Sequence, residues 1–440
     1  MTKKKWSIVF GVVFLMFVIV LVGVGIGMNL EEGSKYPDRG LPVIEISLNG
    51  VSLEEIDGGS KDIKYEGNKL NIYNNSEVMQ YDGVEVKGRG NATWTWDKKP
   101  YQIKFTDKVD LLGMGKSRKW YLMANYGDET NLRTAIGFTL ENMLDMEYAM
   151  DGRFVELYVD EDYRGLYYLT QAVEVSKNGV DLRDPNGVLV ELDNIYGEYE
   201  KNYRTGEGEI LTLKDAVNRD SEVGMMDFLK SYNELEQVVK EGDYKRMEEL
   251  IDVESFAKYF LLSEFTVNPD AYWTSFYMYK DGVNNKIHAG PGWDFDMALA
   301  NRNWWCWLGD RLYSPTEMMV RKLELSLDTW VDMGNDEGEF VPNDLLSRIV
   351  FDMMDMPEFQ GEVRRIFRDR LAGRGRELLM KIKNEAMMIH EVALVDSEKW
   401  VRDRDFTTEV ETLIEWVKAR YEYFEQLYGD KDGDKIELML

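Results

Sequence analysis

Residues 268–301 read N-P-D-A-Y-W-T-S-F-Y-M-Y-K-D-G-V-N-N-K-I-H-A-G-P-G-W-D-F-D-M-A-L-A-N. The aromatic segment Phe276–Tyr279 has the composition of a β-strand and is followed by an Asp-Gly turn. A second strand centred on Ile287 comes next, and the segment Gly290–Gly292 then leads into W-D-F-D. The stretch therefore predicts a hairpin that begins at the end of an apolar helix and carries acidic side chains.

Three aspartates of this stretch are expected to converge. Asp270 lies at the start of the hairpin, and Asp294 and Asp296 lie at its far end. Carboxylates that meet beside apolar walls repel one another unless a cation or a raised pKa relieves them. The alternative is that the three aspartates only cap turns and accept hydrogen bonds from backbone amides, as aspartates in turns do. The spacing alone leaves both interpretations open.

The composition argues against several kinds of site. The formal net charge of the 440 residues is −28, which disfavours nucleic acid as a partner because phosphate binding requires basic patches. The single cysteine, Cys306, cannot form an intrachain disulfide. With only His288 and His390 beside it, the sequence offers no Cys/His zinc site and disfavours a Ser-His-Asp triad.

The N-terminus has the pattern of a membrane anchor. Lys3–Lys5 is basic, and Ile8–Met28 is uncharged and apolar, with about the 20 residues that a transmembrane helix requires. The lysines predict a cytoplasmic N-terminus, so the rest of the chain would lie outside the cell and contact the membrane through residues 1–30. The alternative is a cleaved signal peptide, giving a secreted or spore-coat protein, although the apolar run is long for one and lacks an A-x-A site.

The remaining sequence predicts an α+β fold with two lobes. A linker, residues 31–42, precedes a domain at 43–430, whose β-rich lobe covers about 43–175 and whose α-rich lobe covers about 176–430; a tail follows at 431–440. The predicted strands are 43–48, 63–65, 69–73, 83–87, 103–105, 154–159, 166–170 and 187–193, most of them expected to pair as antiparallel hairpins. The predicted helices are 130–144, 223–241, 244–250, 253–266, 358–389 and 405–428.

A glycine-rich segment, V-K-G-R-G-N-A-T-W at Val86–Trp94, lies between two predicted strands. Such a turn can direct backbone amides and cationic side chains toward a phosphate group. The alternative is a tight bend in which the glycines adopt positive φ. Lys104 alternates with Ile103 and Phe105 on the following strand, and a lysine in that position is usually solvated.

Three tryptophans, Trp304, Trp305 and Trp307, follow the acidic hairpin closely. Exposed aromatic rings stack on sugars or peptides, and a glycan-binding module is one function that such a cluster could serve. More often an aromatic cluster of this kind belongs to the hydrophobic core.

Several longer motifs occur in an order that resembles the CotH family, the spore coat protein H-like atypical protein kinases. They are K-G-R-G-N-A-T-W, K-K-P-Y-Q-I-K-F, L-L-G-M, W-Y-L-M-A-N-Y, F-V-E-L-Y-V-D, R-G-L-Y-Y-L-T, V-L-V-E-L-D and G-P-G-W-D-F-D-M-A-L-A-N. The resemblance is strong over residues 43–301 and looser over the helical C-terminal part. It implies a degenerate protein-kinase-like fold that binds ATP with Mg²⁺ or Mn²⁺ and phosphorylates Ser or Thr in proteins.

The resemblance also implies roles for four residues of the acidic hairpin. Asp294 matches the metal-binding aspartate of the family, and Asp270 matches the catalytic aspartate. Asp296 is either a second metal ligand or a structural acid. Family members usually carry Asn, at the place of a second metal ligand, where this chain has Ser275, so a second metal would be absent or held through water.

On the basic side, the resemblance places three residues in the nucleotide-facing glycine-rich loop, namely Lys87, Arg89 and Asn91. Lys104 is the candidate for the lysine that pairs with the phosphates. A metal held by aspartate and a basic loop together supply what phosphoryl transfer requires, since that reaction depends mostly on positioning and on charge neutralisation.

Three functions follow from these observations. The first is an extracytoplasmic protein kinase that acts on secreted, surface or spore-coat proteins. The second is a catalytically inactive scaffold of the spore coat or cell surface that keeps the fold. The third is the glycan-binding module. The combination of Asp270, Asp294 and the basic loop favours the kinase.

Overall fold

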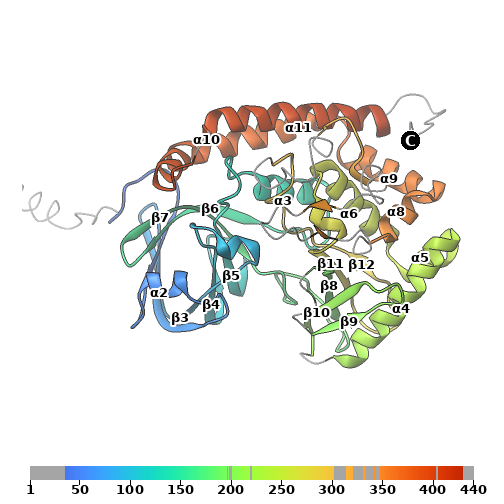
Figure 1. Ribbon diagram of the computed structural model, residues 1–440, viewed down its shortest axis with the longest axis horizontal. Helices are drawn as coiled ribbons and strands as arrows, with labels where there is room; N and C mark the ends of the chain where they lie inside the picture. Colours follow the sequence, from blue (N-terminus) through green and yellow to red (C-terminus); the bar gives the residue numbers. More distant parts are fainter. Residues whose placement is uncertain are drawn as a thin grey trace, which may run out of the picture.

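The computed structural model describes residues 35–195, 197, 201–218, 221–301, 314–320, 331–332, 340–341, 347–402 and 405–429. These residues form a mixed α+β structure in which a β-rich N-terminal region is followed by a mainly helical C-terminal region (Figure 1). The predicted α+β class is therefore confirmed. A short two-stranded sheet, β13 (Val331–Asp332) and β14 (Phe340–Val341), completes the described strands.

The N-terminal region is a closed β-barrel, drawn in blue to teal in Figure 1. In order around the barrel its strands are β1 (Val43–Ser47), β2 (Tyr65–Asn74), β3 (Glu77–Gly88), β4 (Tyr101–Asp110), β5 (Lys116–Met123), β7 (Asp162–Gln171) and β6 (Gly152–Val159). A parallel pairing of β1 with β6, in which Val43 lies opposite Glu156, closes it. The sequence predicted the antiparallel hairpins but not this closure, because a parallel pair between distant strands has no local signature.

The strands form where apolar residues alternate with polar ones. Along β4, Tyr101, Ile103 and Phe105 are buried inside the barrel, while Gln102 and Lys104 are only half-buried on its outer face. This is the period of two that a half-buried strand requires. The two short strands predicted at 63–65 and 69–73 correspond to the single strand β2, which starts at Tyr65 and has irregular pairing before Leu70.

A second sheet lies in the C-terminal region. Its strands, in order, are β12 (His288–Ala289), β11 (Phe276–Lys280), β8 (Val188–Leu192), β10 (Ile210–Ala216) and β9 (Asn202–Arg204). The predicted acidic hairpin is present as β11 and β12, with Met278 opposite Ala289. The predicted centre at Ile287 is wrong by one residue, because Ile287 instead forms an isolated bridge with Ile251. The sequence analysis did not predict β9 and β10.

The first described helix lies against the barrel, whereas the later helices pack around this second sheet and extend back toward the barrel (Figure 1). The described helices are α2 (Leu53–Gly58), α3 (Arg133–Met143), α4 (Glu222–Glu241), α5 (Tyr244–Leu250), α6 (Val253–Thr266), α8 (Ile349–Met354), α9 (Pro357–Arg370), α10 (Gly375–Lys399) and α11 (Phe406–Tyr428), with short 3₁₀ turns η1 (Ala92–Thr95) and η3 (Pro269–Tyr272). The single helix predicted at 358–389 is wrong. It is divided between α9 and α10 at Gly373, whose φ of 73° lies in the left-handed region that ends helices.

Helix α10 is fastened to the barrel by a buried ionic cluster. Asp396 lies 2.7 Å from the ammonium of Lys98 and 3.2 Å from the guanidinium of Arg402, and it accepts a 2.9 Å hydrogen bond from the amide of Leu166 on β7. Neither Lys98 nor Asp396 is exposed to solvent. Burial lowers the pKa of Lys98 to about 8, and the nearby carboxylate of Asp396 opposes this effect. The cluster joins residues that lie more than two hundred positions apart in the sequence.

A second buried pair fastens α11 to α6. Arg420 and Glu264 are both fully buried, and their side chains approach to 3.7 Å. Arg420 also donates to the carbonyls of Phe265, at 3.3 Å, and Glu317, at 2.5 Å. Glu264 accepts a 3.1 Å hydrogen bond from the hydroxyl of Tyr272. Because Tyr272 belongs to η3, this pair also supports the turn that carries one of the predicted catalytic residues.

A buried glutamate on α4 makes the stability depend on pH. Burial, together with the negative charge of nearby Glu209, raises the pKa of Glu236 to about 7, although the 2.7 Å hydrogen bond from Thr205 opposes this shift. The folded protein therefore binds more protons than the unfolded chain between the ordinary glutamate pKa and about pH 7. The free energy of unfolding should fall as the pH rises through that window.

Glu236→Gln should remove this penalty. We expect the variant to exceed the wild type in free energy of unfolding by about 1–2 kcal/mol at pH 8, with a smaller difference at pH 5, as urea denaturation at both values would measure. The control Glu234→Gln changes a more exposed residue of the same helix and should alter stability by less than about 0.5 kcal/mol at either pH. A Glu236→Gln difference that is the same at both pH values would contradict the prediction.

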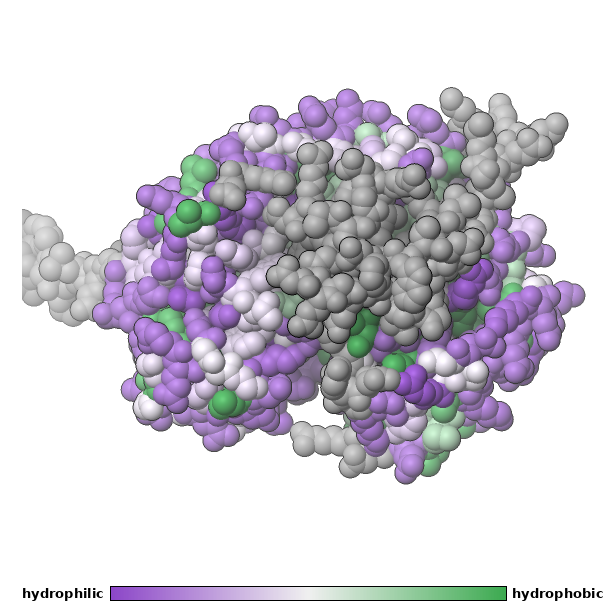
Figure 2. Space-filling model, in the orientation of Figure 1, coloured by the Kyte–Doolittle hydropathy of each residue, from purple (hydrophilic) through white to green (hydrophobic). Residues whose placement is uncertain are grey.

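The described surface agrees with the acidic composition. Figure 2 shows one face of the molecule. The described part of that face is mainly hydrophilic, with small and scattered hydrophobic groups. Scattered exposed apolar side chains are normal on protein surfaces and indicate no site by themselves.

The predicted membrane location requires correction. Among the residues that the structure describes, no helix combines the length and the apolar character needed to span a bilayer. This finding contradicts the prediction that the protein crosses the membrane once. The apolar segment on which that expectation depended, Ile8–Met28, lies outside the described residues.

Candidate active site

The residues that precede the hairpin hold the first aspartate in a fixed turn. Helix α6 ends at Thr266. The capping residue Val267 has a left-handed φ of 49°, and Asn268 then leads into η3, which begins at Pro269. Proline suits the first position of a helical turn because its ring presets φ. Asp270 follows and is only 8% exposed. The turn therefore presents this carboxylate from a buried and rigid position.

The structure brings together the three aspartates of the hairpin. One carboxylate oxygen from each of Asp270, Asp294 and Asp296 lies within 4.8 Å of the other two. Asp294 has a φ of 62°, an uncommon conformation for a residue other than glycine, and such conformations concentrate at functional sites. The hydroxyl of Ser275 donates a 3.1 Å hydrogen bond to Asp294. Ser275 thus touches the acidic group from the position where the resemblance implies a metal ligand.

The electrostatics of this group favour either protons or a cation. Burial raises the pKa of Asp270 well above its ordinary value, and the negative charges of Asp294, Asp296 and Asp193 raise it further. Burial likewise raises the pKa of Asp296, with a further contribution from Asp294. Three carboxylates so close together cannot all be ionised without a compensating positive charge.

Arg89 supplies part of that compensation. Burial raises the pKa of Asp294, whereas the charge of Arg89 and the Ser275 hydrogen bond lower it. The Arg89 guanidinium lies 4.4 Å from the centre of the Tyr121 ring and 5.8 Å from that of Trp293. Stacking of this kind holds a planar guanidinium while leaving its edge available for an anion.

The donor set fits a divalent cation. Magnesium and manganese prefer carboxylate oxygens, and two oxygens on one Mg²⁺ at about 2.1 Å lie at most about 4.2 Å apart. The 4.8 Å limit on the three carboxylate oxygens is close to that separation, so small side-chain rotations would complete it. Asp296 also accepts a hydrogen bond from the backbone amide of Met297, so it serves partly as the turn-capping acid of the alternative interpretation.

Two residues of the basic loop are directed elsewhere. Lys87 is half-buried, and burial lowers its pKa, while its charged neighbours are Asp62, Lys61 and Lys64. Asn91 is exposed and accepts a hydrogen bond from Lys61. Among the described residues, no recorded interaction connects Lys87 or Asn91 to the three aspartates, so of this loop only Arg89 is brought to them.

Lys104 lies on the outer face of the barrel. In the sheet it is opposite Glu85 on β3 and Lys119 on β5. No recorded interaction within the described part of the chain joins it to the acidic group. Its predicted role as the phosphate-pairing lysine therefore stays a prediction that the geometry leaves without support.

The sequence analysis missed three charged residues on the sheet beside the site. Asp193 accepts a 2.8 Å hydrogen bond from Thr274 and is close enough to raise the pKa of Asp270. Glu191 pairs with Lys214 at 2.8 Å and is hydrogen-bonded to Tyr277. The signal was present in V-L-V-E-L-D, because an acid within a buried strand and another directly after it are costly unless they have partners.

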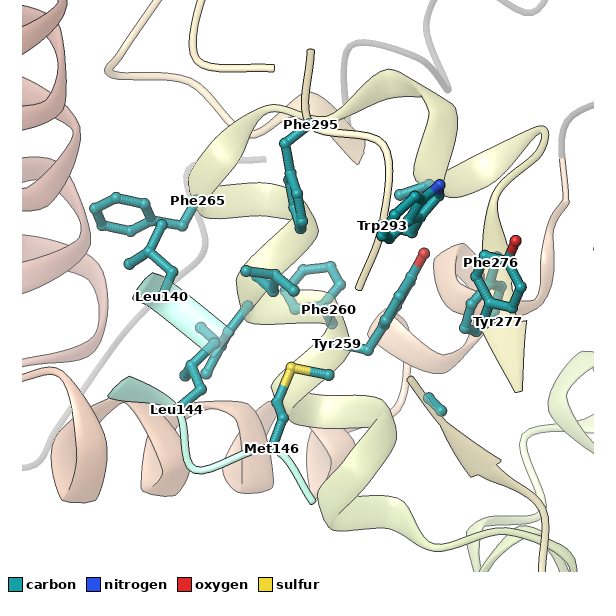
Figure 3. Close-up of a cluster of buried hydrophobic side chains, with 14 of the residues drawn as sticks. Leu140, Leu144, Met146, Tyr259, Phe260, Phe265, Phe276, Tyr277, Trp293 and Phe295 are labelled. Atoms are coloured by element: carbon teal, nitrogen blue, oxygen red, sulfur yellow. The ribbon is translucent and has the colours of Figure 1, made fainter. Parts of the chain in front are cut away.

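The tryptophans proposed for a glycan-binding module, Trp304, Trp305 and Trp307, lie outside the described residues. The aromatic residues that surround the acidic hairpin are buried instead. Figure 3 shows Trp293, Phe295, Tyr259 and Tyr277 in one cluster around α6. They form the apolar walls that the sequence analysis expected beside the aspartates.

Comparison with known protein families supports the resemblance that the sequence motifs indicated. A family profile described as CotH kinase protein matches residues 86–424, which is most of the chain and includes the glycine-rich loop, the acidic hairpin and the C-terminal helices. No curated protein matches the sequence. The resemblance found in the sequence motifs is thereby confirmed, and the protein belongs to the CotH kinase family.

Proposed function

We propose that the protein is a protein kinase that transfers the γ-phosphate of ATP to Ser or Thr side chains of other proteins. The observation that carries the proposal is the meeting of Asp270, Asp294 and Asp296 within 4.8 Å beside the guanidinium of Arg89. Membership of a family described as kinases supports it. The partner is accordingly an acceptor protein, and the net charge of −28 disfavours nucleic acid.

Asp294 and Asp296 are the proposed metal ligands. A divalent ion bound there, Mg²⁺ or Mn²⁺, would neutralise charge on the transferred phosphoryl group. Ser275 orients Asp294 through its hydrogen bond, and a water molecule between a hydroxyl and the ion is the form of contact that suits an uncharged ligand. Arg89 faces Asp294 from the barrel side and offers planar donors for phosphate oxygens.

Asp270 is the proposed base that orients the acceptor hydroxyl and takes its proton. Its buried position on η3 fixes the carboxylate. Burial and the neighbouring carboxylates raise its pKa, so a cation held by Asp294 and Asp296 would keep Asp270 ionised and able to accept a proton. Asp193 and the Glu191–Lys214 pair adjoin this group on β8 and β10. We propose that they complete the polar wall of the site.

The test uses the full chain with ATP labelled in the γ-phosphate, Mg²⁺ or Mn²⁺ and a generic acceptor protein. We expect metal-dependent label on Ser or Thr, abolished by a chelator and by Asp294→Ala. The matched control Asp369→Ala removes an exposed carboxylate that is ion-paired on α9 and should leave the transfer rate unchanged.

Each other outcome assigns a different function. Binding of ATP without transfer under either metal would overturn the kinase and favour the catalytically inactive scaffold, for which Ser275 in place of a stronger ligand is the supporting observation. If the protein did not bind ATP, both the kinase and a scaffold that binds ATP would be wrong.

A further inference from the structure

One face of helix α3 lies along the backbone that carries the proposed metal ligands. Arg133, Gly137 and Glu141 are spaced four residues apart, so they project from the same side of the helix. Each of the three contacts a different position of the segment Gly292–Ala298. The order of the contacts is reversed along the segment, so the helix and the segment run antiparallel.

The central contact is a close approach at Gly137. A Cβ atom built on Gly137 would lie 2.3 Å from Cδ2 of the Phe295 ring, a separation that real Cβ atoms do not show. Any side chain at this position would therefore push Phe295 away from the helix. Figure 3 shows Phe295 pointing down into the buried cluster that contains Leu140 of α3. Because Phe295 stands between Asp294 and Asp296 in the chain, moving its ring moves both carboxylates.

The contact near the end of the helix is made by Glu141. This side chain is fully buried, and it accepts a 2.8 Å hydrogen bond from the amide of Met150. The amide of Gly292 also faces the carboxylate, and a Cβ on Gly292 would lie 2.4 Å from Oε1. A buried acid is costly to the fold unless its oxygens are hydrogen-bonded, and here the hydrogen bond comes from the amide of Met150. Glu141 fixes the point at which the segment approaches the helix.

The contact at the start of the helix is made by Arg133. Its guanidinium donates a 3.0 Å hydrogen bond to the carbonyl of Ala298 and is ion-paired with Asp128. Asp128 in turn accepts from the amide of Arg133, at 2.9 Å, so the pair is held at the helix N-terminus. Ala298, at the end of the segment Gly292–Ala298, is thus tied to α3, the helix that Gly292 approaches at the beginning of the segment.

We infer that α3 acts as a clamp that sets the positions of Asp294 and Asp296, and that Gly137 and Glu141 are positioning residues for the metal. This inference rests on the metal site of the proposed function and adds to it a means by which that site is shaped. Metal ligation tolerates displacements of only a few tenths of an ångström, so a shift of the Phe295 ring is sufficient to weaken it.

The test measures Mn²⁺ binding to the full chain, by electron paramagnetic resonance of the free ion and without nucleotide, together with thermal unfolding. We expect Gly137→Ala to weaken Mn²⁺ binding by about 10-fold or more. The control is Gly375→Ala, another helical glycine whose added Cβ would meet an aromatic ring, 2.4 Å from Tyr421. It should lower the unfolding temperature to a similar extent and leave Mn²⁺ binding within about two-fold.

A compensating change separates the clamp from general damage to the fold. In Gly137→Ala with Phe295→Leu the smaller side chain makes room for the new methyl group, so Mn²⁺ binding should recover toward that of Phe295→Leu alone. Glu141→Ala should weaken Mn²⁺ binding, whereas Glu141→Gln, which keeps one acceptor oxygen for the amides, should restore part of it.

The outcomes distinguish this inference from the proposed function. If Gly137→Ala binds Mn²⁺ as tightly as the wild type or as Gly375→Ala does, the inference that α3 sets the positions of Asp294 and Asp296 is wrong. This holds even if the wild type transfers phosphate. If the wild type binds Mn²⁺ and the variants lose it as expected, the clamp stands even where no phosphate is transferred.

Discussion

Asp270→Asn is expected to lower the rate of phosphoryl transfer by about 100- to 10,000-fold while changing the affinity for Mn²⁺ by less than about three-fold. The reason is that the amide keeps the size of the side chain but cannot accept the proton of the acceptor hydroxyl. Asp294→Asn should instead weaken Mn²⁺ binding by about 10-fold or more and lose transfer as a result. Single-turnover transfer and Mn²⁺ titration, done on the same preparations, measure the two effects separately.

A comparison of the transfer rate with the Mn²⁺ affinity of each variant decides which aspartate is the base and which is the metal ligand. The three carboxylates are mutually within 4.8 Å, so distance alone does not distinguish a base from a ligand. If Asp270→Asn lost Mn²⁺ to the same extent as Asp294→Asn, Asp270 would be a metal ligand and the proposed base would be wrong. Asp369→Asn, on the exposed face of α9, controls for the loss of a negative charge.

Arg420→Met is expected to produce the largest loss of stability, about 3–5 kcal/mol in the free energy of unfolding. The substitution removes a fully buried guanidinium together with its hydrogen bonds to the carbonyls of Phe265 and Glu317. It also leaves Glu264 buried without its cation. Burial lowers the pKa of Arg420 to about 10, although the negative charge of Glu264 opposes this shift. Urea denaturation monitored by fluorescence would measure the loss.

Arg365→Met is the matched control for this prediction. Arg365 forms ion pairs with Glu254, Glu362 and Asp369, more than Arg420 forms, but its side chain is 47% exposed. We expect a loss of less than about 1 kcal/mol, because exposed ion pairs are screened by water. Equal losses of unfolding free energy for Arg420→Met and Arg365→Met would show that the burial of Arg420 does not cause its large effect. Arg420→Met with Glu264→Gln should cost less than the two single changes added together.

The sequence predicted elements well where the local pattern was strong. The acidic hairpin, α6 and α11 were placed to within about two residues, because alternation, apolar periodicity and capping residues are local properties. The closure of the barrel by β1 and β6 could not be predicted in this way, since nothing near Val43 indicates that its partner is Glu156. The break at Gly373 was overlooked because the apolar periodicity resumes in α10.

The site could be predicted only in part, for a similar reason. The convergence of Asp270 with Asp294 and Asp296 follows from a hairpin, and the sequence shows a hairpin directly. The contributions of Lys87, Asn91 and Lys104 depended on which way a loop and a strand face, which is decided by packing across the barrel. Glu191 lies on β8, Asp193 directly follows β8, and Lys214 lies on β10; the pairing of β8 with β11 and with β10 is not local.

The link between the barrel and α10 bears on how the protein is made. Lys98, which lies just before β4, is made early in synthesis, but its counter-ion Asp396 and the neighbouring Arg402 leave the ribosome only about three hundred residues later. Until then the ammonium of Lys98 lacks this counter-ion, so the ionic contact between the barrel and α10 can form only after the C-terminal helices have been made. A product interrupted before this point therefore lacks the ionic contact that joins residues near the two ends of the described chain.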